Sequence, residues 1–521
     1  MNELHSGGTL GGMIVGAVTR FGYKPAIGDG TISWSYRELG DAIARFIAIF
    51  RSLGLTKGDA VSILSSNRAE SWAAICAVSV MGMRYTPLHP MAAEDDHAFI
   101  VDDAEIDTLI VEASKFGARG HAIKTRVSRL KHLLSFGPLD GALDVLAQLP
   151  QVTPQPLVNE SETSAIAWLA YTGGTTGRSK GVMLPHRSVI TMTTLLYADW
   201  DWPPEVRFLA ATPISHAAGV TLYPVMFRGG YMRLVQGFDA EVYCRVVQDD
   251  RITATFLVPT LIYALIDGVE LRKRFDLSSL QMIVYGAAPM SPDRLREGMA
   301  IFGPVFLQLY GQTEAPQCIT TMRKIDHDDS KPGRLGSCGR PNPLVEVKLF
   351  DSEMREVATG EPGEICVRGT LVMDGYWKRP EATEEAFRGG WLHTGDVAVK
   401  DEDGYFYIVD RTKDMIISGG FNIYPREVED ALMSHHAVAS AAVIGVPDDK
   451  WGEAVKAFVV LKTGANNNAA ELQAHVKEKR GAPWSPKSID FVESIPVTGL
   501  GKIDRKVLRA PYWEGRKRGV A

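Results

Sequence analysis

The sequence predicts an α/β protein with a large N-terminal domain of layered α/β sheets plus a β-rich subdomain, and a small α+β C-terminal domain. In the first part, short β-rich apolar segments alternate with helical segments, which is typical of largely parallel sheets covered by helices. From about Gly339 the strands become shorter and alternate with Gly and Pro turns. A fresh run of strands and helices follows Asp410, so we expect a domain boundary near residue 411.

Local patterns predict the individual elements. Ser35 and Glu38 form a capping box ahead of an apolar stripe at helical spacing, which ends at Gly54. For the first part we predict strands at 60–64, 108–111, 165–170, 208–211, 253–258 and 282–285, and helices at 241–248 and 294–301. Strands at 345–350, 363–368 and 405–409 make up the β-rich subdomain. The C-terminal part contains strands at 441–445 and 457–461 and helices at 426–434 and 470–479.

Composition excludes several classes of protein. Hydrophobic residues make up 45% of the 521 positions and charged residues 23%, so wholesale disorder is excluded. The 56 Lys and Arg against 62 Asp and Glu give a net charge of -6 without long runs of one sign. Nucleic acid is therefore not expected as a partner.

Cysteine usage and the N-terminal segment predict location. The 5 cysteines are far apart and include no CxxC pair, so their spacing indicates neither a disulfide framework nor a zinc site, and we expect a cytoplasmic protein. The apolar stretch near the N-terminus is short, broken by glycines and followed by Arg20, unlike a signal peptide. No window reaches the roughly 18 apolar residues of a membrane span, so no integral membrane segment is expected.

One glycine-rich string has the chemistry of a phosphate-binding loop. The segment 171–181, Tyr-Thr-Gly-Gly-Thr-Thr-Gly-Arg-Ser-Lys-Gly, directly follows a predicted strand. Its glycines allow close backbone approach to an anion, while its hydroxyls and Lys180 supply donors and charge. Arg178 and Ser179 separate the last loop glycine from Lys180, which disfavours a P-loop kinase or GTPase. A plain surface turn is the alternative for such a string.

The string resembles the signature of the adenylate-forming superfamily, which includes acyl-CoA synthetases, aryl-CoA ligases, luciferases and peptide-synthetase adenylation domains. Four further motifs of that superfamily occur in the same order. They are Tyr-Gly-Gln-Thr-Glu at 310–314, Trp-Leu-His-Thr-Gly-Asp at 391–396, the segment 410–425 that begins Asp-Arg-Thr-Lys-Asp, and Pro-Val-Thr-Gly-Leu-Gly-Lys-Ile-Asp-Arg at 496–505. Together the five motifs cover most of the chain.

The resemblance implies ATP, Mg²⁺ and CoA as ligands and assigns residues to them. Tyr310 would stack on the adenine, Thr313 would contact the α-phosphate, and Asp396 with Arg411 would bind the ribose. Glu314 would hold the Mg²⁺, although a lone glutamate is ordinarily a solvated surface acid. The full set of expected ATP-binding residues is Thr172, Gly173, Gly174, Thr175, Thr176, Gly177, Lys180, Gly286, Ala287, Ala288, Tyr310, Gly311, Gln312, Thr313, Asp396, Arg411 and Lys502.

The implied reaction has two halves. A carboxylate and Mg-ATP give acyl-adenylate and pyrophosphate, and a thiol then displaces AMP. In this family a small C-terminal domain turns about a hinge between the halves, which implies an N-terminal domain over 1–409, a hinge over 410–414 at Lys413, and a mobile domain over 415–521. Lys502 would act in adenylation, and Ser418, Gly419 and Gly420 would face CoA.

The expected catalytic residues are Lys502, Lys180 and His216. Two interpretations of His216 stay open, since it lies where relatives gate thiol entry but is equally suited to a structural role. The apolar residues that follow it, Val220, Leu222, Tyr223 and Met226, have helical spacing and are expected in the core.

Three positions depart from the family pattern. Gly173 stands where relatives usually have Ser or Thr, and Ser179 stands where they usually have Pro. Both changes predict weaker phosphate binding. Phe421 stands where many aryl-specific relatives have Glu, which mildly favours acyl-type relatives. None of the three removes a charge that the first half-reaction needs.

These features favour an acyl- or aryl-CoA synthetase whose substrate is a small-molecule carboxylic acid, either fatty, alicyclic or aromatic. The alternatives are a carrier-protein-directed adenylation enzyme and a non-catalytic acid-binding homologue; the scaffold also supports light-emitting oxygenases. Ser215 to Ala218 offer no carboxylate for an α-ammonium, which disfavours amino-acid substrates. The small residues at 217–219 and 286–288 suggest a roomy pocket, unless they serve close backbone packing. A homodimer is the expected oligomer if the chain associates.

Overall fold

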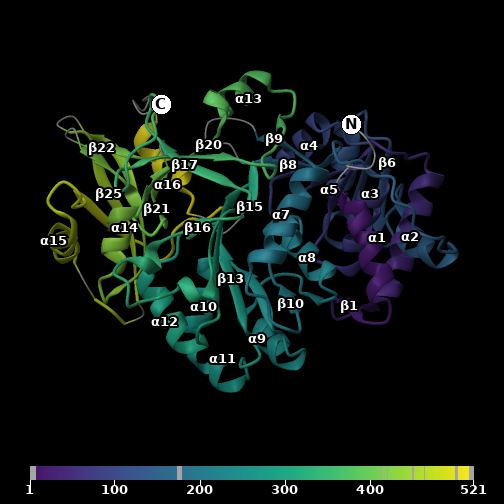
Figure 1. Cartoon of the computed structure of the whole chain (residues 1–521), viewed down its shortest axis with the longest axis horizontal. Helices are drawn as coiled ribbons and strands as arrows, with labels where there is room; N and C mark the ends of the chain where they lie inside the picture. The colour runs from purple at the N-terminus through teal and green to yellow at the C-terminus, as the bar shows by residue number, and fades with distance from the viewer. Residues whose placement is uncertain are drawn as a thin grey trace.

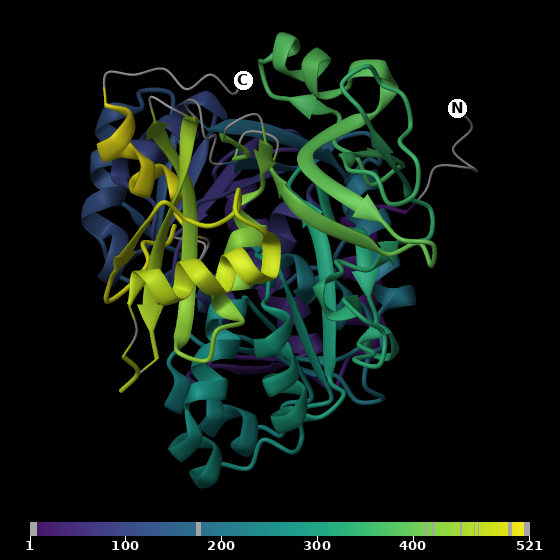
Figure 2. The same cartoon turned by 90° about the vertical axis from the view of Figure 1, so that its left-hand side faces the viewer.

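The computed structural model describes residues 8–172, 179–411, 414–418, 421–448, 451–462, 464–466, 468–498 and 503–514, with backbone only at 410, 411 and 422. Figure 1 shows the N-terminal strands and helices on the right and the C-terminal ones on the left. From the side, the C-terminal elements lie in front of the rest (Figure 2). The described residues form four sheets.

Two of these sheets are large and mainly parallel. The nine-stranded one has the order β16 (Arg340–Pro341), β15 (Ala315–Met322), β14 (Phe306–Gln312), β13 (Met282–Gly286), β12 (Ala254–Leu257), β10 (Arg207–Ala210), β11 (Tyr231–Leu234), β1 (Pro25–Gly28) and β2 (Ser33–Ser35). The eight-stranded one has the order β19 (Gly375–Tyr376), β9 (Lys180–Pro185), β8 (Ile166–Thr172), β4 (Arg84–Pro87), β3 (Ala60–Leu64), β5 (Thr108–Glu112), β6 (His132–Phe136) and β7 (Leu143–Asp144).

Antiparallel pairing is confined to the ends of these two sheets. Strands β8 and β9 pair antiparallel at one end of the smaller sheet, and β14 and β15 do so toward one end of the larger. The glycine-rich string and the Tyr310 motif lie in these two hairpins. The predicted α/β layering is confirmed, and the sequence motifs fall where the strand direction reverses.

The other two sheets are smaller. An antiparallel sheet has the order β17 (Glu346–Phe350), β18 (Gly363–Arg368), β20 (Leu392–Lys400) and β21 (Phe406–Arg411), as expected of the β-rich subdomain. The C-terminal sheet has the order β23 (Phe421–Ile423), β22 (Ile416–Ser418), β25 (Gly452–Leu461) and β24 (Val438–Asp448), and β26 (Ser488–Phe491) pairs with β25.

Helices cover the sheets. They are α1 (Leu10–Phe21), α2 (Tyr36–Ser52), α3 (Ala69–Val80), α4 (Glu94–Asp103), α5 (Ala113–Arg126), α6 (Val145–Gln148), α7 (His186–Asp199), α8 (Ala217–Phe227), α9 (Ala240–Asp249), α10 (Pro259–Asp267), α11 (Val269–Arg274), α12 (Pro292–Phe302), α13 (Pro380–Ala386), α14 (Pro425–Met433), α15 (Ala469–Arg480) and α16 (Arg505–Trp513). The predicted capping box begins α2: Ser35 Oγ accepts from the Glu38 amide, and the Glu38 carboxylate accepts from the Ser35 amide.

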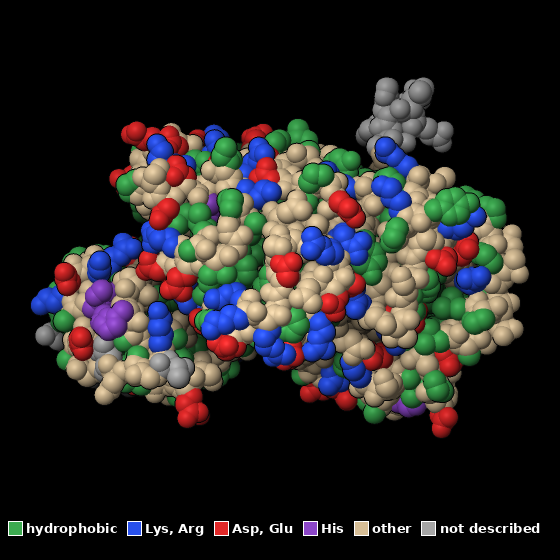
Figure 3. Space-filling model, turned by 90° about the horizontal axis from the view of Figure 1, so that it is seen from below, with side chains coloured by type: hydrophobic (Ala, Val, Ile, Leu, Met, Phe, Trp, Pro, Cys, Tyr) green, Lys and Arg blue, Asp and Glu red, His purple; other side chains and the backbone are tan. Residues whose placement is uncertain are grey.

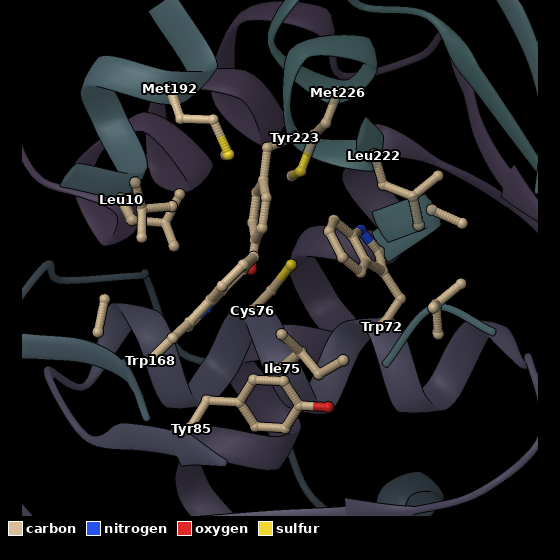
Figure 4. Packing of buried hydrophobic residues seen from close by; sticks show 14 of the residues in the cluster. Leu10, Trp72, Ile75, Cys76, Tyr85, Trp168, Met192, Leu222, Tyr223 and Met226 are labelled. Atoms are coloured by element: carbon tan, nitrogen blue, oxygen red, sulfur yellow. The ribbon is translucent and has the colours of Figure 1, made fainter. Parts of the chain in front are cut away.

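The main core joins the two large sheets through α1, α2, α3, α7 and α8. Tyr223 of α8 lies between Trp72 of α3 and Trp168 of β8, with ring centroids 4.8 and 5.6 Å away (Figure 4). Leu222, Tyr223 and Met226 are fully buried, as expected of core residues, whereas Val220 is only partly buried against the same core. Burying side chains of this size contributes about 1.5–3 kcal/mol each.

Charge on the face seen in Figure 3 is mixed, and the cysteines form no disulfide. Figure 3 shows cationic and anionic side chains interspersed over one face, without a broad region of either sign. All five cysteines are buried and none is in a disulfide. Within the described ranges, no helix is long and apolar enough to span a bilayer.

Candidate active site

The turn of the β14–β15 hairpin carries the predicted metal residue. Gln312 pairs with Ala315, which leaves Thr313 and Glu314 in the turn. Glu314 is only 8% exposed and its Oε1 accepts a hydrogen bond from Tyr376 Oη at 2.8 Å. It is thus no solvated surface acid. Among the described residues none donates to Oε2.

Tyr376 connects this hairpin to the phosphate-loop hairpin. Lys180 begins β9, in the phosphate-loop hairpin. Its ammonium lies 4.8 Å from the centre of the Tyr376 ring. Burial, and then the charge of Glu314, raise the pKa of the Tyr376 hydroxyl far above its usual range, so it stays a hydrogen-bond donor. Lys180 and Glu314, which belong to different large sheets, thus contact the same tyrosine.

The phosphate loop itself is only partly described. Thr172 ends β8 and pairs with Lys180, and its hydroxyl lies 3.5 Å from the Lys180 carbonyl. Gly173, Gly174, Thr175, Thr176 and Gly177 lie outside the described residues. The described ends fix where the loop leaves and rejoins the sheet.

The predicted ribose site contacts the predicted adenine site directly. Tyr310 Oη donates to Asp396 Oδ2 at 2.7 Å, and Asp396 is 7% exposed. Burial raises the pKa of Tyr310 well above its usual value and the Asp396 carboxylate adds to this, so the hydroxyl is protonated. The Asp396 backbone amide bonds to the Thr394 hydroxyl, and Asp396 pairs in register with Arg411 across β20 and β21.

Glycines bring the strands of this region close together. A Cβ on Gly286 would lie 2.4 Å from the Leu309 carbonyl oxygen, and one on Gly311 would lie 2.5 Å from the Gln317 amide nitrogen. Ala287, next to Gly286, has a φ of 62°, a strained conformation for a non-glycine residue that is found at binding sites. Ala288 follows it in the same bend.

Of the two interpretations that the sequence left open for the small residues, the glycines at 219 and 286 support close backbone packing. A Cβ on Gly219 would lie 1.8 Å from the Ile214 carbonyl oxygen, so this glycine, like Gly286, serves close backbone packing. The adjoining cavity is narrow, with a volume of about 20 Å³, far below the roughly 300 Å³ or more of typical small-molecule sites. It is lined by Trp72, Ile75, Tyr85, Pro87, Trp168, Ile214, Ser215, His216, Gly219, Val220 and Tyr223.

His216 lies at the N-terminus of α8. It is the N-cap residue of that helix, and its ring meets the ring of His89 edge-on at 5.0 Å. Burial, and then the charge of nearby His97, lower the pKa of His89, which favours its neutral form. His216 therefore borders the narrow cavity beside a neutral ring.

Two side chains at this site have no signal in the sequence. Tyr376 belongs to a two-residue strand with no periodicity. Gln317 has a φ of 57° and donates from Nε2 to the Ala217 carbonyl at 2.8 Å, while its buried Oε1 has no partner in the described part of the chain. Gln317 thereby joins β15 to the start of α8.

Most of the predicted site residues of the C-terminal domain lie outside the described residues. Ser418 ends β22, is 5% exposed and pairs with Phe421 and Gly452. Lys413, Gly419, Gly420 and Lys502 lie outside the described residues, and for Arg411 only the backbone is described.

Comparison with known proteins places the chain in a family. Residues 16–377 match the model of the AMP-binding enzyme family and residues 427–502 that of the AMP-binding enzyme C-terminal domain, so the chain belongs to this family. It is an AMP-forming carboxylic acid–CoA ligase, an acyl- or aryl-CoA synthetase.

Its relatives include fatty-acid and aryl-acid ligases. It is 44% identical to a medium/long-chain-fatty-acid–CoA ligase of Mycobacterium tuberculosis, over 98% of this chain and 91% of that one. It is 36% identical to a feruloyl-CoA synthase of an Amycolatopsis species, over 94% and 96% of the two chains. The solved structure of an amide bond synthetase from Marinactinospora thermotolerans has a TM-score of 0.89 at 33% identity and covers 96% of this chain and 100% of that one.

Proposed function

We propose that this ligase activates an apolar monocarboxylic acid, a fatty acid or an aryl acid, with ATP and Mg²⁺, and passes the acyl group to CoA. One observation carries the proposal: three sheets bring Lys180, Glu314, Tyr310 and Asp396 to one site, linked through Tyr376 and through the Tyr310–Asp396 hydrogen bond. A cation, an acid, an aromatic ring and a second acid are the groups that a metal nucleotide needs.

In this proposal each group has one task. Asp396 accepts hydrogen bonds from the ribose hydroxyls, and Tyr310 covers the adenine. Lys180 and the loop 173–177 bind phosphate, with Lys502 offsetting charge as the carboxylate attacks the α-phosphorus. Thr172, Gly286 to Ala288 and Gly311 to Thr313 shape the backbone around the nucleotide.

The donor set suits Mg²⁺. Glu314 offers a buried carboxylate with one oxygen held by Tyr376 and the other without a donor among the described residues. Mg²⁺ prefers oxygen donors and is commonly held by one or two carboxylates together with substrate phosphates. A bound Mg²⁺ would neutralise part of the triphosphate charge.

The cavity beside His216 supports the choice of acid. None of its lining residues is Lys, Arg, Asp or Glu. A second carboxylate or an ammonium on the substrate would therefore be buried without a partner, which costs several kcal/mol. Because the cavity is narrow, the chain or ring of the acid must displace wall side chains such as Val220 as it enters.

We further propose the domain arrangement 1–409, 410–414 and 415–521, with Lys413 as the hinge and Ser418, Gly419 and Gly420 facing CoA. Five buried cysteines without disulfides suit a reducing cytoplasm. A homodimer is the oligomer we would look for first, by size-exclusion chromatography with light scattering.

The test is release of AMP and pyrophosphate from ATP with fatty, alicyclic, benzoic, cinnamic and dicarboxylic acids, each with and without CoA. We expect AMP release that needs both an apolar monocarboxylic acid and CoA. Acid-dependent pyrophosphate exchange indifferent to CoA would indicate a carrier protein as acceptor. Preference for a dicarboxylic acid would refute the proposed pocket, and no turnover with any acid would favour a non-catalytic homologue.

A further inference from the structure

A second cluster of reactive side chains lies in the antiparallel sheet behind the ribose site. Cys366 of β18 is directly opposite His393 of β20 in the strand register, and Glu364 is two residues before Cys366. Residues two apart on a strand share a face, so all three side chains converge. Within the described part of the chain they are the one trio of His, Cys, Asp or Glu whose ligand atoms all lie within 4.8 Å of one another.

The hydrogen bonds of His393 orient its ring. Nε2 lies 3.1 Å from the carbonyl oxygen of Arg388, and because a carbonyl only accepts, Nε2 carries a hydrogen. Nδ1 faces Glu364 Oε2 at 2.7 Å and Cys366 Sγ at 3.6 Å. With the ring hydrogen on Nε2, both Nδ1 and the Glu364 carboxylate are acceptors. A proton or a metal ion is therefore needed between them. Histidines that bind metals typically donate their other ring hydrogen to a carbonyl in this way.

We propose that Glu364, Cys366 and His393 bind a zinc-type divalent cation, with a fourth position open to water. Sulfur, imidazole and carboxylate ligands suit Zn²⁺, and three protein ligands plus one open position are a common arrangement. The thiol releases its proton to solvent as the metal–sulfur bond forms. Carboxylate and thiolate then balance the two charges of the cation.

The surroundings allow a cation to reach the cluster and to matter for the enzyme. The side chains of His393 and Glu364 are 10% and 23% exposed, whereas Cys366 is buried against Phe350 and Trp391. Glu364 Oε1 also accepts from the Gly395 amide at 2.9 Å, directly before Asp396. A metal on Oε2 would therefore stiffen the segment that presents the ribose carboxylate. Binding of the cation is measured directly and does not require the proposed acid substrate.

The experiment is a titration of the chelator-treated full chain with Co²⁺, followed by optical absorption. A thiolate ligand gives cobalt a charge-transfer band, which a purely histidine and carboxylate site elsewhere on the chain would not produce. We expect one equivalent of Co²⁺ with this band, and its displacement by Zn²⁺. Glu364→Gln keeps an oxygen for the Gly395 amide but loses the charge, so Co²⁺ should bind about 10-fold more weakly or worse.

The matched variants are Cys366→Ala and Cys244→Ala, since both cysteines are buried but Cys244 lies in a separate core cluster. The band should vanish in Cys366→Ala and persist in Cys244→Ala, with circular dichroism confirming the fold of each. If Cys366→Ala does not fold, loss of the band in His393→Gln replaces it. Absence of a thiolate band in the unmodified chain, or a band that survives Cys366→Ala, overturns the proposal and leaves a proton between Glu364 and His393.

Discussion

Replacing Tyr310 with Phe tests the link between the adenine and ribose sites. The change keeps the aromatic ring and removes the hydroxyl that donates to Asp396 at 2.7 Å. A hydrogen bond to a charged group contributes about 1.5–3 kcal/mol. Asp396 keeps its backbone bond to Thr394 and its pairing with Arg411, so we expect the lower end of that range for nucleotide binding. A loss of about 1.4 kcal/mol corresponds to a 10-fold rise in KM for ATP, with a small effect on kcat.

The assay is steady-state AMP release at varied ATP and saturating acid and CoA. Tyr405→Phe is the matched control, because the Tyr405 hydroxyl donates to the buried Asp326 carboxylate at 2.6 Å, outside the proposed site. Both variants should lose about 1–3 kcal/mol of unfolding free energy, but only Tyr310→Phe should raise KM for ATP. An unchanged KM in Tyr310→Phe, or an equal rise in Tyr405→Phe, would refute the assignment of Asp396 to ribose.

Three further predictions concern the two half-reactions, the metal and pH. Lys502→Ala should abolish acyl-adenylate formation while sparing thioester formation from a preformed adenylate, and Gly420→Leu should do the reverse; equal loss of both halves in either variant would contradict the two-orientation mechanism. Glu314→Gln should raise the Mg²⁺ concentration for half-maximal adenylation about 10-fold, and an unchanged requirement would exclude Glu314 as the ligand. Burial lowers the pKa of His186 and of His327 from 6.5 to about 4, so unfolded chains take up these protons first. Unfolding free energy should therefore be full above pH 6.5 and fall toward pH 4 by roughly 3 kcal/mol for each histidine, and urea denaturation of His186→Gln should show a shallower fall.

The parts of the fold that the sequence predicts are those governed by local patterns. The capping box at Ser35 and Glu38 needs only residues three apart, and it starts α2 as expected. The strand at 363–368 is bounded by turn residues and has the predicted limits. By contrast, the sequence left open whether the small residues at 217–219 create space or serve close packing, because the outcome at Gly219 depends on Ile214 facing it.

Site residues that act through long-range pairing have no local signal. Tyr376 contacts Glu314 from 62 positions away, on a strand of two residues. Cysteine spacing indicates no metal site, yet strand register places Cys366 opposite His393 across an irregularity between Glu364 and Cys366. A one-residue change of register would turn these side chains to the other face, so no inspection of spacing could have found the cluster.

The arrangement of the site suggests how nucleotide and hinge are coupled. Asp396 lies on β20 and pairs in register with Arg411, the last residue of β21 and the second of the proposed hinge segment. A nucleotide bound to Asp396 would thus hold the strand pair from which the chain leaves for the C-terminal sheet. Since a ligand shifts a conformational equilibrium only through contacts that differ between states, the ribose contact with Asp396, which the acyl-adenylate keeps, should not by itself turn the domain. The proposed turn would then come from the contacts that Lys502 and the phosphate loop lose when pyrophosphate leaves. Lys502 is therefore the residue whose removal should leave the population of the second orientation unresponsive to adenylation.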